Sequence, residues 1–226
     1  MTDRPKPITD DIGAESGLAL HYVSRDRRSA LATIWTLDAR MRALFAAARE
    51  PALAQIKLAW WEERLTELRG GAAPAEPLLR SLAPLAVSGE AAGELRDLAG
   101  AWRELGDAPW PSEEIEAYAR LRGGALIAAS ARALGARADA RMMASGEGLA
   151  VTDLAGIAGD AAVRDGLLAE ADARFRAAGR FAWPRALRPV GMIVALARED
   201  ARHGALGAPG SPRRVARMAW HAVSGR

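Results

Sequence analysis

The sequence predicts an all-α protein, and two observations support this fold class. Alanine is abundant, while runs of Val, Ile, Thr and Tyr, which favour strands, are almost absent. Apolar residues also recur at spacings of three and four, the period of a helix face. The 226 residues suffice for one well-buried domain. We expect residues 1–8, which are polar and rich in proline, to form a disordered tail and residues 9–226 to form a single helical domain.

The clearest helix is predicted at residues 51–68, where a proline suits the first helical position. Leu58, Trp61 and Leu65 fall at i, i+3 and i+7, so they share one face of this helix and are expected in the core. A second apolar set lies on nearly the opposite side and consists of Leu53, Ile56 and Trp60. We therefore expect this helix to be sandwiched between other helices.

Capping signals and apolar periodicity predict the other helices. Their expected ranges are 9–23, 26–49, 77–87, 90–105, 113–134, 139–158, 160–178, 184–203 and 212–223. Ser112 is expected to cap the helix at 113–134. Gly123 and Gly124 lie inside that helix, where each glycine costs about 1 kcal/mol relative to alanine. Such glycines indicate close contact with another helix or a space for a ligand, and close contact is the commoner cause.

Several function classes are excluded by the residues and motifs that the chain lacks. It has no cysteine, which removes disulfides, thiolate metal sites and a cysteine nucleophile. It has no P-loop, no glycine-rich dinucleotide motif and no H-E-x-x-H zinc motif. No apolar run reaches the roughly 18 to 20 residues that span a bilayer, and no secretory signal opens the sequence. We therefore expect a cytoplasmic location.

Arginine is concentrated toward the C-terminus, although the formal net charge is only +3. From Arg174 onward the chain has eleven arginines against two carboxylates, Glu199 and Asp200. This block indicates either an anionic partner or a solvated face. A nucleic acid is not an expected partner, because aromatic residues are not interleaved with the basic ones.

The last predicted helix, 212–223, combines basic and apolar side chains. Its relevant members are Arg213, Arg214, Val215, Arg217, Met218 and Trp220. A helix of this composition can lie at an anionic lipid surface, which predicts peripheral attachment to the inner membrane. The alternative is that its apolar residues pack on the bundle while its arginines face water.

Four segments share their residue order with segments of one protein family. Residues 56–65, I-K-L-A-W-W-E-E-R-L, match that family's I-R-L-Q-W-W-R-x-x-L helix, and residues 27–37 its R-R-x-A-L-x-A-L-Y-A-F helix. Residues 70–77 match its A-G-x-A-P-x-H-P turn, and residues 116–135 its E-A-Y-A-x-x-T-A-G-A-L-L helix. Together they resemble the squalene/phytoene synthase family, especially its divergent bacterial branch. The resemblance implies the class I isoprenoid (terpenoid) synthase bundle, shortened here in its C-terminal half.

The resemblance implies a head-to-head condensation of two prenyl diphosphates, in which two aspartate-rich segments hold Mg²⁺ ions. In the first segment, the alignment places Arg42 and Ala46 where the family has aspartates. Asp38 is the only carboxylate nearby, and its helical partner four residues on is Arg42. A cation and a methyl group cannot hold magnesium.

The second aspartate-rich segment is best matched by residues 151–160. Asp153 stands at the family's asparagine, Ile157 replaces its aspartate, and Asp160 stands at its glutamate. Asp153 and Asp160 are seven positions apart and would share a face if they lay on one helix. The candidate catalytic residues are therefore Asp38, Asp153 and Asp160, and no metal ligand is assigned.

The resemblance leaves two functions open. The degenerate segments favour a synthase-like protein that has lost Mg-dependent catalysis and acts as a binding or assembly factor, a role that some divergent relatives have for respiratory complex I. The alternative is a prenyltransferase of squalene/phytoene synthase type, which would need Mg²⁺, or a prenyl-lipid binder. Expected partners are a protein, a prenyl diphosphate or lipid, or an anionic membrane. A central apolar cavity lined by Trp35, Leu58 or Trp61 is expected unless side chains fill it.

Overall fold

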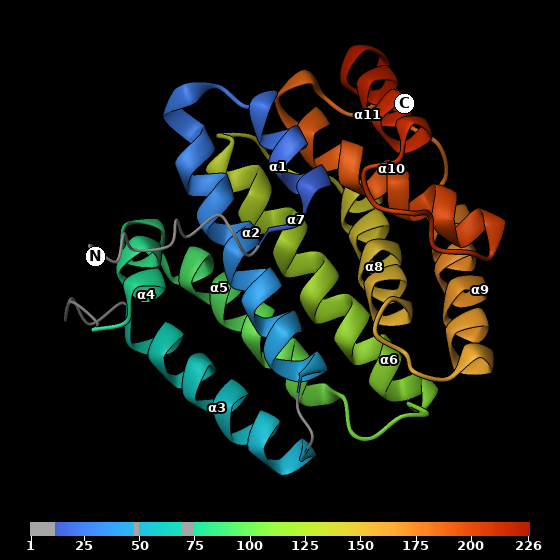
Figure 1. The fold of residues 1–226 in the computed structure, drawn as a ribbon. Coiled ribbons are helices and arrows are strands. Elements are labelled where there is room, and N and C mark those ends of the chain that lie inside the picture. Colours follow the sequence, from blue (N-terminus) through green and yellow to red (C-terminus); the bar gives the residue numbers. More distant parts are fainter. Residues whose placement is uncertain (1–11, 48–49, 69–74) are drawn as a thin grey trace, which may run out of the picture.

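The computed structural model describes residues 12–47, 50–68 and 75–226, and every regular element in these ranges is helical (Figure 1). The predicted all-α class is confirmed. The expected tail at residues 1–8 lies outside the described residues. Across the described residues, none of the helices combines the length and the apolarity that crossing a bilayer requires.

The helices follow one another along the chain with short connections. They are α1 (Ala14–His21), α2 (Arg25–Ala46), α3 (Pro51–Glu67), α4 (Pro77–Leu82), α5 (Gly89–Gly100), α6 (Ser112–Tyr118), α7 (Gly124–Ala133), α8 (Ala140–Ala155), α9 (Ala161–Ala178), α10 (Arg188–His203) and α11 (Pro212–Ser224). A π-helical turn, η5 (Ala119–Gly123), joins α6 to α7. Most of the predicted ranges agree with these bounds to within a few residues.

Two differences from the predicted helices matter for the site. The helix expected at 113–134 is continuous, but its hydrogen-bond pattern changes to the wider π type at η5. At its start Pro111 occupies the N-cap position, and no side chain caps the helix, so the expected role of Ser112 is not observed. A π turn adds a residue to one helical turn and so changes which side chains point inward, a feature frequent at functional sites.

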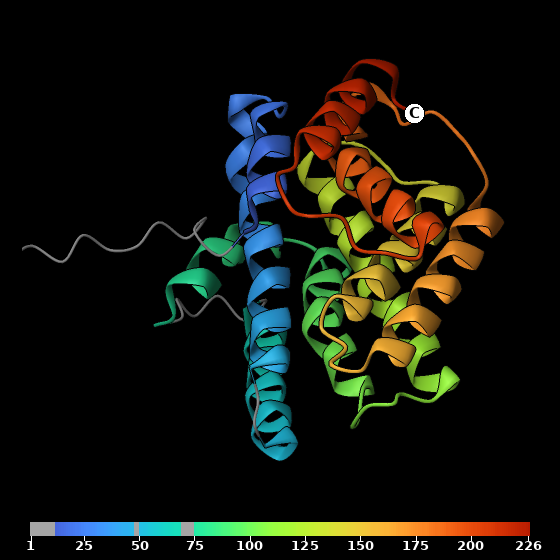
Figure 2. The same cartoon turned by 45° about the vertical axis from the view of Figure 1, so that its right-hand side comes forward.

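The bundle is held together by one continuous hydrophobic core, whose buried members run from Ala19 to Met218. Helix α2 packs against α3, α5 and α7, while α8 packs against η5, α9 and α10. Figure 1 shows α3 at one edge of the bundle and α9 at the opposite edge. Figure 2 shows α2 and α3 on one side of the molecule, with α8, α9 and the two last helices on the other. Helices α2, η5 and α8 therefore meet in the interior.

Helix α3 is covered on one face only. Leu58, Trp61 and Leu65 are buried as predicted. The second apolar face instead meets solvent, with exposed fractions of 49% for Leu53, 66% for Ile56 and 42% for Trp60. The expectation that α3 is sandwiched between helices is wrong, because α2 and α5 both pack on the same side of it.

Helix α11 is fixed to the bundle by an ion-pair network and not only by apolar contact. Arg214 lies between Glu15 of α1 and Asp200 of α10, with nitrogen-to-oxygen distances of 2.6 Å to each. Met218 is fully buried, whereas Trp220 is 64% exposed. Arg214 and Met218 therefore cannot take part in the lipid-facing stripe that the sequence predicts for this helix.

A contact between two glycines sets the distance between η5 and α8. A Cβ atom added to Gly123 would lie 2.4 Å from the carbonyl oxygen of Gly146, and one added to Gly146 would lie 2.4 Å from the carbonyl oxygen of Gly123. Backbone atoms cannot move aside as flexible side chains can. The close contact that the mid-helix glycines predicted is thus found at Gly123. A Cβ atom added to Gly124 would lie near only the side chain of Met143, at 3.5 Å.

This contact predicts opposite effects for neighbouring substitutions. Gly123→Ala should destabilise the protein by about 2 kcal/mol or more, because the added methyl group forces η5 and α8 apart. Gly124→Ala should be neutral or stabilise it by up to about 1 kcal/mol, because alanine is the better helix former and the space exists. Urea unfolding of both variants measures the difference. Equal stability of the two variants would contradict the glycine contact.

Candidate functional site

A buried arginine joins two of the three carboxylates that the sequence singles out. Nε and Nη2 of Arg122, from η5, donate to the two carboxylate oxygens of Asp38 of α2, both at 2.7 Å. Nη2 of Arg122 also donates to Oδ2 of Asp153 of α8 at 2.6 Å. We call Asp38, Arg122 and Asp153 the arginine bridge. It links three elements that are distant in the sequence.

The surroundings of Arg122 keep it charged and immobile. Its side chain is 1% exposed, and its guanidinium carbon lies 5.4 Å from the ring centre of Trp102 and 5.9 Å from that of Tyr118. Burial alone would lower the pKa of Arg122, but the attraction of Asp38 and Asp153 outweighs burial and holds the pKa well above its ordinary value. Burial has the opposite effect on the Tyr118 hydroxyl: it raises the pKa of this group, which therefore stays neutral.

A second arginine approaches the bridge from the side. Nη1 of Arg42, from α2, lies 3.8 Å from Oδ1 of Asp153. The helical pair expected between Asp38 and Arg42 is not what the structure shows, because Asp38 is turned to Arg122 and Arg42 faces α8. Two guanidinium groups thus face two carboxylates, and the cluster is close to neutral as a whole.

The bridge forms one wall of a cavity of about 310 Å³. Side chains from α1, α2, η5, α7, α8 and α10 line it, and among them are Trp35, Asp38, Arg42, Arg122 and Asp153. The indole of Trp35 is held by a 3.1 Å hydrogen bond from its Nε1 to the hydroxyl of Ser130. The cavity therefore has a charged wall and an aromatic one.

The structure places the predicted site residues in different environments. Trp35 lines the cavity. Leu58 and Trp61 lie on the buried face of α3, and α3 contributes no residue to the cavity lining described. Asp160 accepts a hydrogen bond from the backbone N–H of Val163 at 2.9 Å and caps α9. Since α8 ends at Ala155, Asp153 and Asp160 lie on different helices and do not share a face.

Sequence reasoning missed the residue that organises this site. Arg122 carries no local signal within the segment 116–135, because pair rules within one helix do not reveal partners on other helices. The signal that could have found it is an arginine directly before Gly123 and Gly124 in an apolar helix. A cation next to a close helix contact is held at a short distance from the neighbouring backbone and needs an acidic partner there.

The residues of this site do not fit a magnesium ion. A metal between the helices would need free carboxylate oxygens on both sides. Both oxygens of Asp38 accept hydrogen bonds from Arg122, and Asp153 is shared between Arg122 and Arg42. The guanidinium of Arg122 therefore occupies the place where a bridging cation would have to bind, and we derive no step through a metal.

The bridge predicts a graded loss of stability on substitution. Arg122→Met should cost about 3 to 5 kcal/mol in the free energy of unfolding, because it leaves a buried carboxylate unpaired. Asp38→Asn should cost more than Asp153→Asn, since the side chain of Asp38 is 12% exposed and that of Asp153 is 24% exposed. Urea unfolding of each variant provides the measurement.

The control for this series restores charge balance. A triple variant with Arg122→Met, Asp38→Asn and Asp153→Asn should recover part of the stability that Arg122→Met alone loses, because no buried charge is then unpaired. An Arg122→Met protein as stable as the unsubstituted one would show that the bridge is not a structural link.

Comparisons with known proteins identify no family for this chain. No protein-family model matches the chain, and no curated protein or solved structure matches it either.

Proposed function

We propose that this chain is a synthase-like helical bundle without Mg-dependent prenyltransferase activity, and that it acts as a binding or assembly factor. The observation that carries the proposal is the arginine bridge, in which Arg122 neutralises Asp38 and Asp153 from within the protein. The sequence resemblance to the squalene/phytoene synthase family supports a shared bundle with a shortened C-terminal half. That resemblance also suggests the assembly of a respiratory complex as the setting.

The charge of the site supports a non-catalytic role. A metal-dependent prenyltransferase uses bound cations to stabilise the negative charge of the departing diphosphate. In this chain the cation is a side chain whose hydrogen bonds are directed at Asp38 and Asp153. Withdrawing it to meet a substrate would leave a buried carboxylate unpaired, at a cost of several kcal/mol.

The size of the cavity supports the same conclusion. A head-to-head condensation must hold two long prenyl chains together with their reacting ends in contact. The central cavity is about 310 Å³, which is at the lower end of the roughly 300 to 1,000 Å³ that pockets for a single small ligand occupy. It is therefore too small for two substrates, although a short apolar group fits beside Trp35.

An exposed apolar face supports a role in binding another protein. Leu53, Ile56 and Trp60 project from α3 on the side away from the core, and all three are well exposed. The ring of Trp60 packs edge to face on Trp61, with 5.5 Å between ring centres, so part of its orientation is fixed by the core. A tryptophan whose orientation is fixed by its neighbours and which lies among aliphatic side chains is typical of the centre of a protein interface. The partner that suits this face has an apolar groove for a helix.

An activity assay separates this proposal from its alternative. Purified protein incubated with Mg²⁺ and either farnesyl diphosphate plus NADPH or geranylgeranyl diphosphate should yield no squalene or phytoene, because the bridge leaves no place for the metal. Product formation is followed by chromatography of the organic extract, with an active squalene or phytoene synthase as the positive control. Formation of squalene or phytoene above a no-protein control would overturn the proposal and establish a prenyltransferase.

A further inference from the structure

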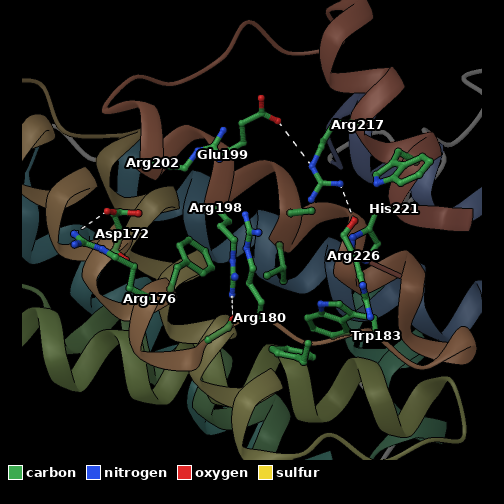
Figure 3. A pocket seen from close by; sticks show the side chains of 16 residues that line it. Asp172, Arg176, Arg180, Trp183, Arg198, Glu199, Arg202, Arg217, His221 and Arg226 are labelled. Atoms are coloured by element: carbon green, nitrogen blue, oxygen red, sulfur yellow. Dashed lines mark hydrogen bonds and ion pairs between the residues drawn. The ribbon is translucent and has the colours of Figure 1, made fainter. Parts of the chain in front are cut away.

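A second pocket, of about 1,000 Å³, lies between α9, α10 and α11 and shares no lining residue with the central cavity (Figure 3). We call it the basic pocket. Its charged lining residues are Arg176, Arg180, Arg198, Arg202, Arg217 and Arg226, together with Asp172 and Glu199. Six cations thus face two carboxylates around a solvent-open hollow.

The two carboxylates are already paired. Asp172 forms an ion pair with Arg176 at 2.8 Å on the surface of α9. Glu199 accepts a hydrogen bond from Nε of Arg213, which is not part of the lining, at 3.0 Å, and lies 4.0 Å from Arg217. Both carboxylates thus already have an arginine partner, and the lining still holds more cations than carboxylates.

The arginines in the middle of the pocket have little to compensate their charge. Figure 3 shows Arg180 and Arg198 standing side by side in the hollow. Arg198 donates to the carbonyl oxygen of Gly179 at 2.9 Å, and its guanidinium lies 5.2 Å from the ring centre of Phe175. Within the described part of the chain, no carboxylate forms an ion pair with Arg180, Arg198 or Arg202. These three guanidinium groups therefore retain charge that no carboxylate ion pair balances, although Arg198 also donates to Gly179.

The mutual repulsion of these cations shows in their titration. Burial lowers the pKa of Arg198, and the nearby charges of Arg180 and Arg217 lower it further, while Asp172 offsets part of this effect. Burial also lowers the pKa of Arg217, with additional lowering from Arg202 and Arg180, while Glu199 raises it and offsets part of this effect. An anion placed among them would reverse this repulsion, which is the behaviour of a site built for negative charge.

The rim of the basic pocket is aromatic. Trp183 and Phe181 pack together with 5.5 Å between ring centres, and both line the hollow. Trp220, also in the lining, is 64% exposed, and Val223, one turn further along α11, is 76% exposed. His221 adds no charge at neutral pH, because burial and the charge of Arg217 lower its pKa to about 4. The pocket therefore combines unpaired guanidinium groups with an exposed apolar edge.

We propose that the basic pocket binds a phosphate-bearing anion, held by Arg180 and Arg198, with Arg202 of the same lining adding positive charge. Planar guanidinium groups bind phosphate oxygens through paired charge-assisted hydrogen bonds. The phosphate belongs either to a free anion or to the headgroup of an anionic phospholipid, in which case Trp220 and Val223 enter the membrane interface. The proposal does not depend on the function of the central cavity, since the two sites share no residue.

The first test uses inorganic pyrophosphate and isothermal titration calorimetry at low salt. The unsubstituted protein should bind it, and a double variant with Arg180→Gln and Arg202→Gln should bind it about tenfold more weakly or worse. The matched control carries Arg137→Gln and Arg185→Gln, which removes the same two charges from exposed positions outside the pocket. The control should bind as the unsubstituted protein does. No binding by the unsubstituted protein, or equal weakening in both double variants, would overturn the proposal.

The second test identifies the source of the phosphate. Co-sedimentation is measured with vesicles of phosphatidylcholine alone and of phosphatidylcholine mixed with phosphatidylglycerol. If the ligand is a lipid headgroup, the protein binds only the anionic vesicles, pyrophosphate competes, and the Arg180 and Arg202 variant does not bind. If the ligand is a free anion, the vesicles do not bind although pyrophosphate does. Vesicle binding that neither pyrophosphate nor the Arg180 and Arg202 substitutions reduce would show general surface attraction and contradict a phosphate site.

Discussion

The position of Arg122 between Asp38 and Asp153 is the interaction on which the rest of the interior depends. It joins α2, η5 and α8 in a region where apolar packing alone would leave two charges buried and a third half-buried. The arrangement requires η5 and α8 to lie in backbone contact, which the Gly123 and Gly146 pair permits. Geometry and charge are therefore coupled: the glycines bring the cation close to α8, and the carboxylates make its burial tolerable.

The molecule separates its charges into two regions with different properties. In the central cavity every cation faces a carboxylate, so the site has little net charge with which to bind an anion. In the basic pocket the cations outnumber the carboxylates, and both carboxylates already pair with an arginine. An anionic ligand is thus better accommodated between α9, α10 and α11 than in the interior of the bundle. The apolar face of α3, at the opposite edge, is suited to a different kind of partner.

Local sequence patterns predicted the helices well and their partners poorly. The prolines at the starts of α3, α4 and α11 mark helix ends through their fixed backbone angle, so they can be read from the sequence. Asp160, expected as a site residue, instead caps α9. The bridge joins residues 84 and 31 positions apart, which no helical spacing reveals. The prediction that a helix covers the second face of α3 was wrong for a related reason. Apolar periodicity shows that Ile56 and Trp60 share a side of α3, but it does not show whether another helix covers that side.

The most direct test of the central claim is a crystal structure of the protein grown with Mn²⁺, a stand-in for Mg²⁺ that anomalous scattering locates. The account predicts that the guanidinium of Arg122 remains between Asp38 and Asp153, with no anomalous peak within coordination distance of either carboxylate. A manganese ion bound to both carboxylates, with Arg122 displaced, would contradict it. That result would support metal-dependent catalysis in the central cavity.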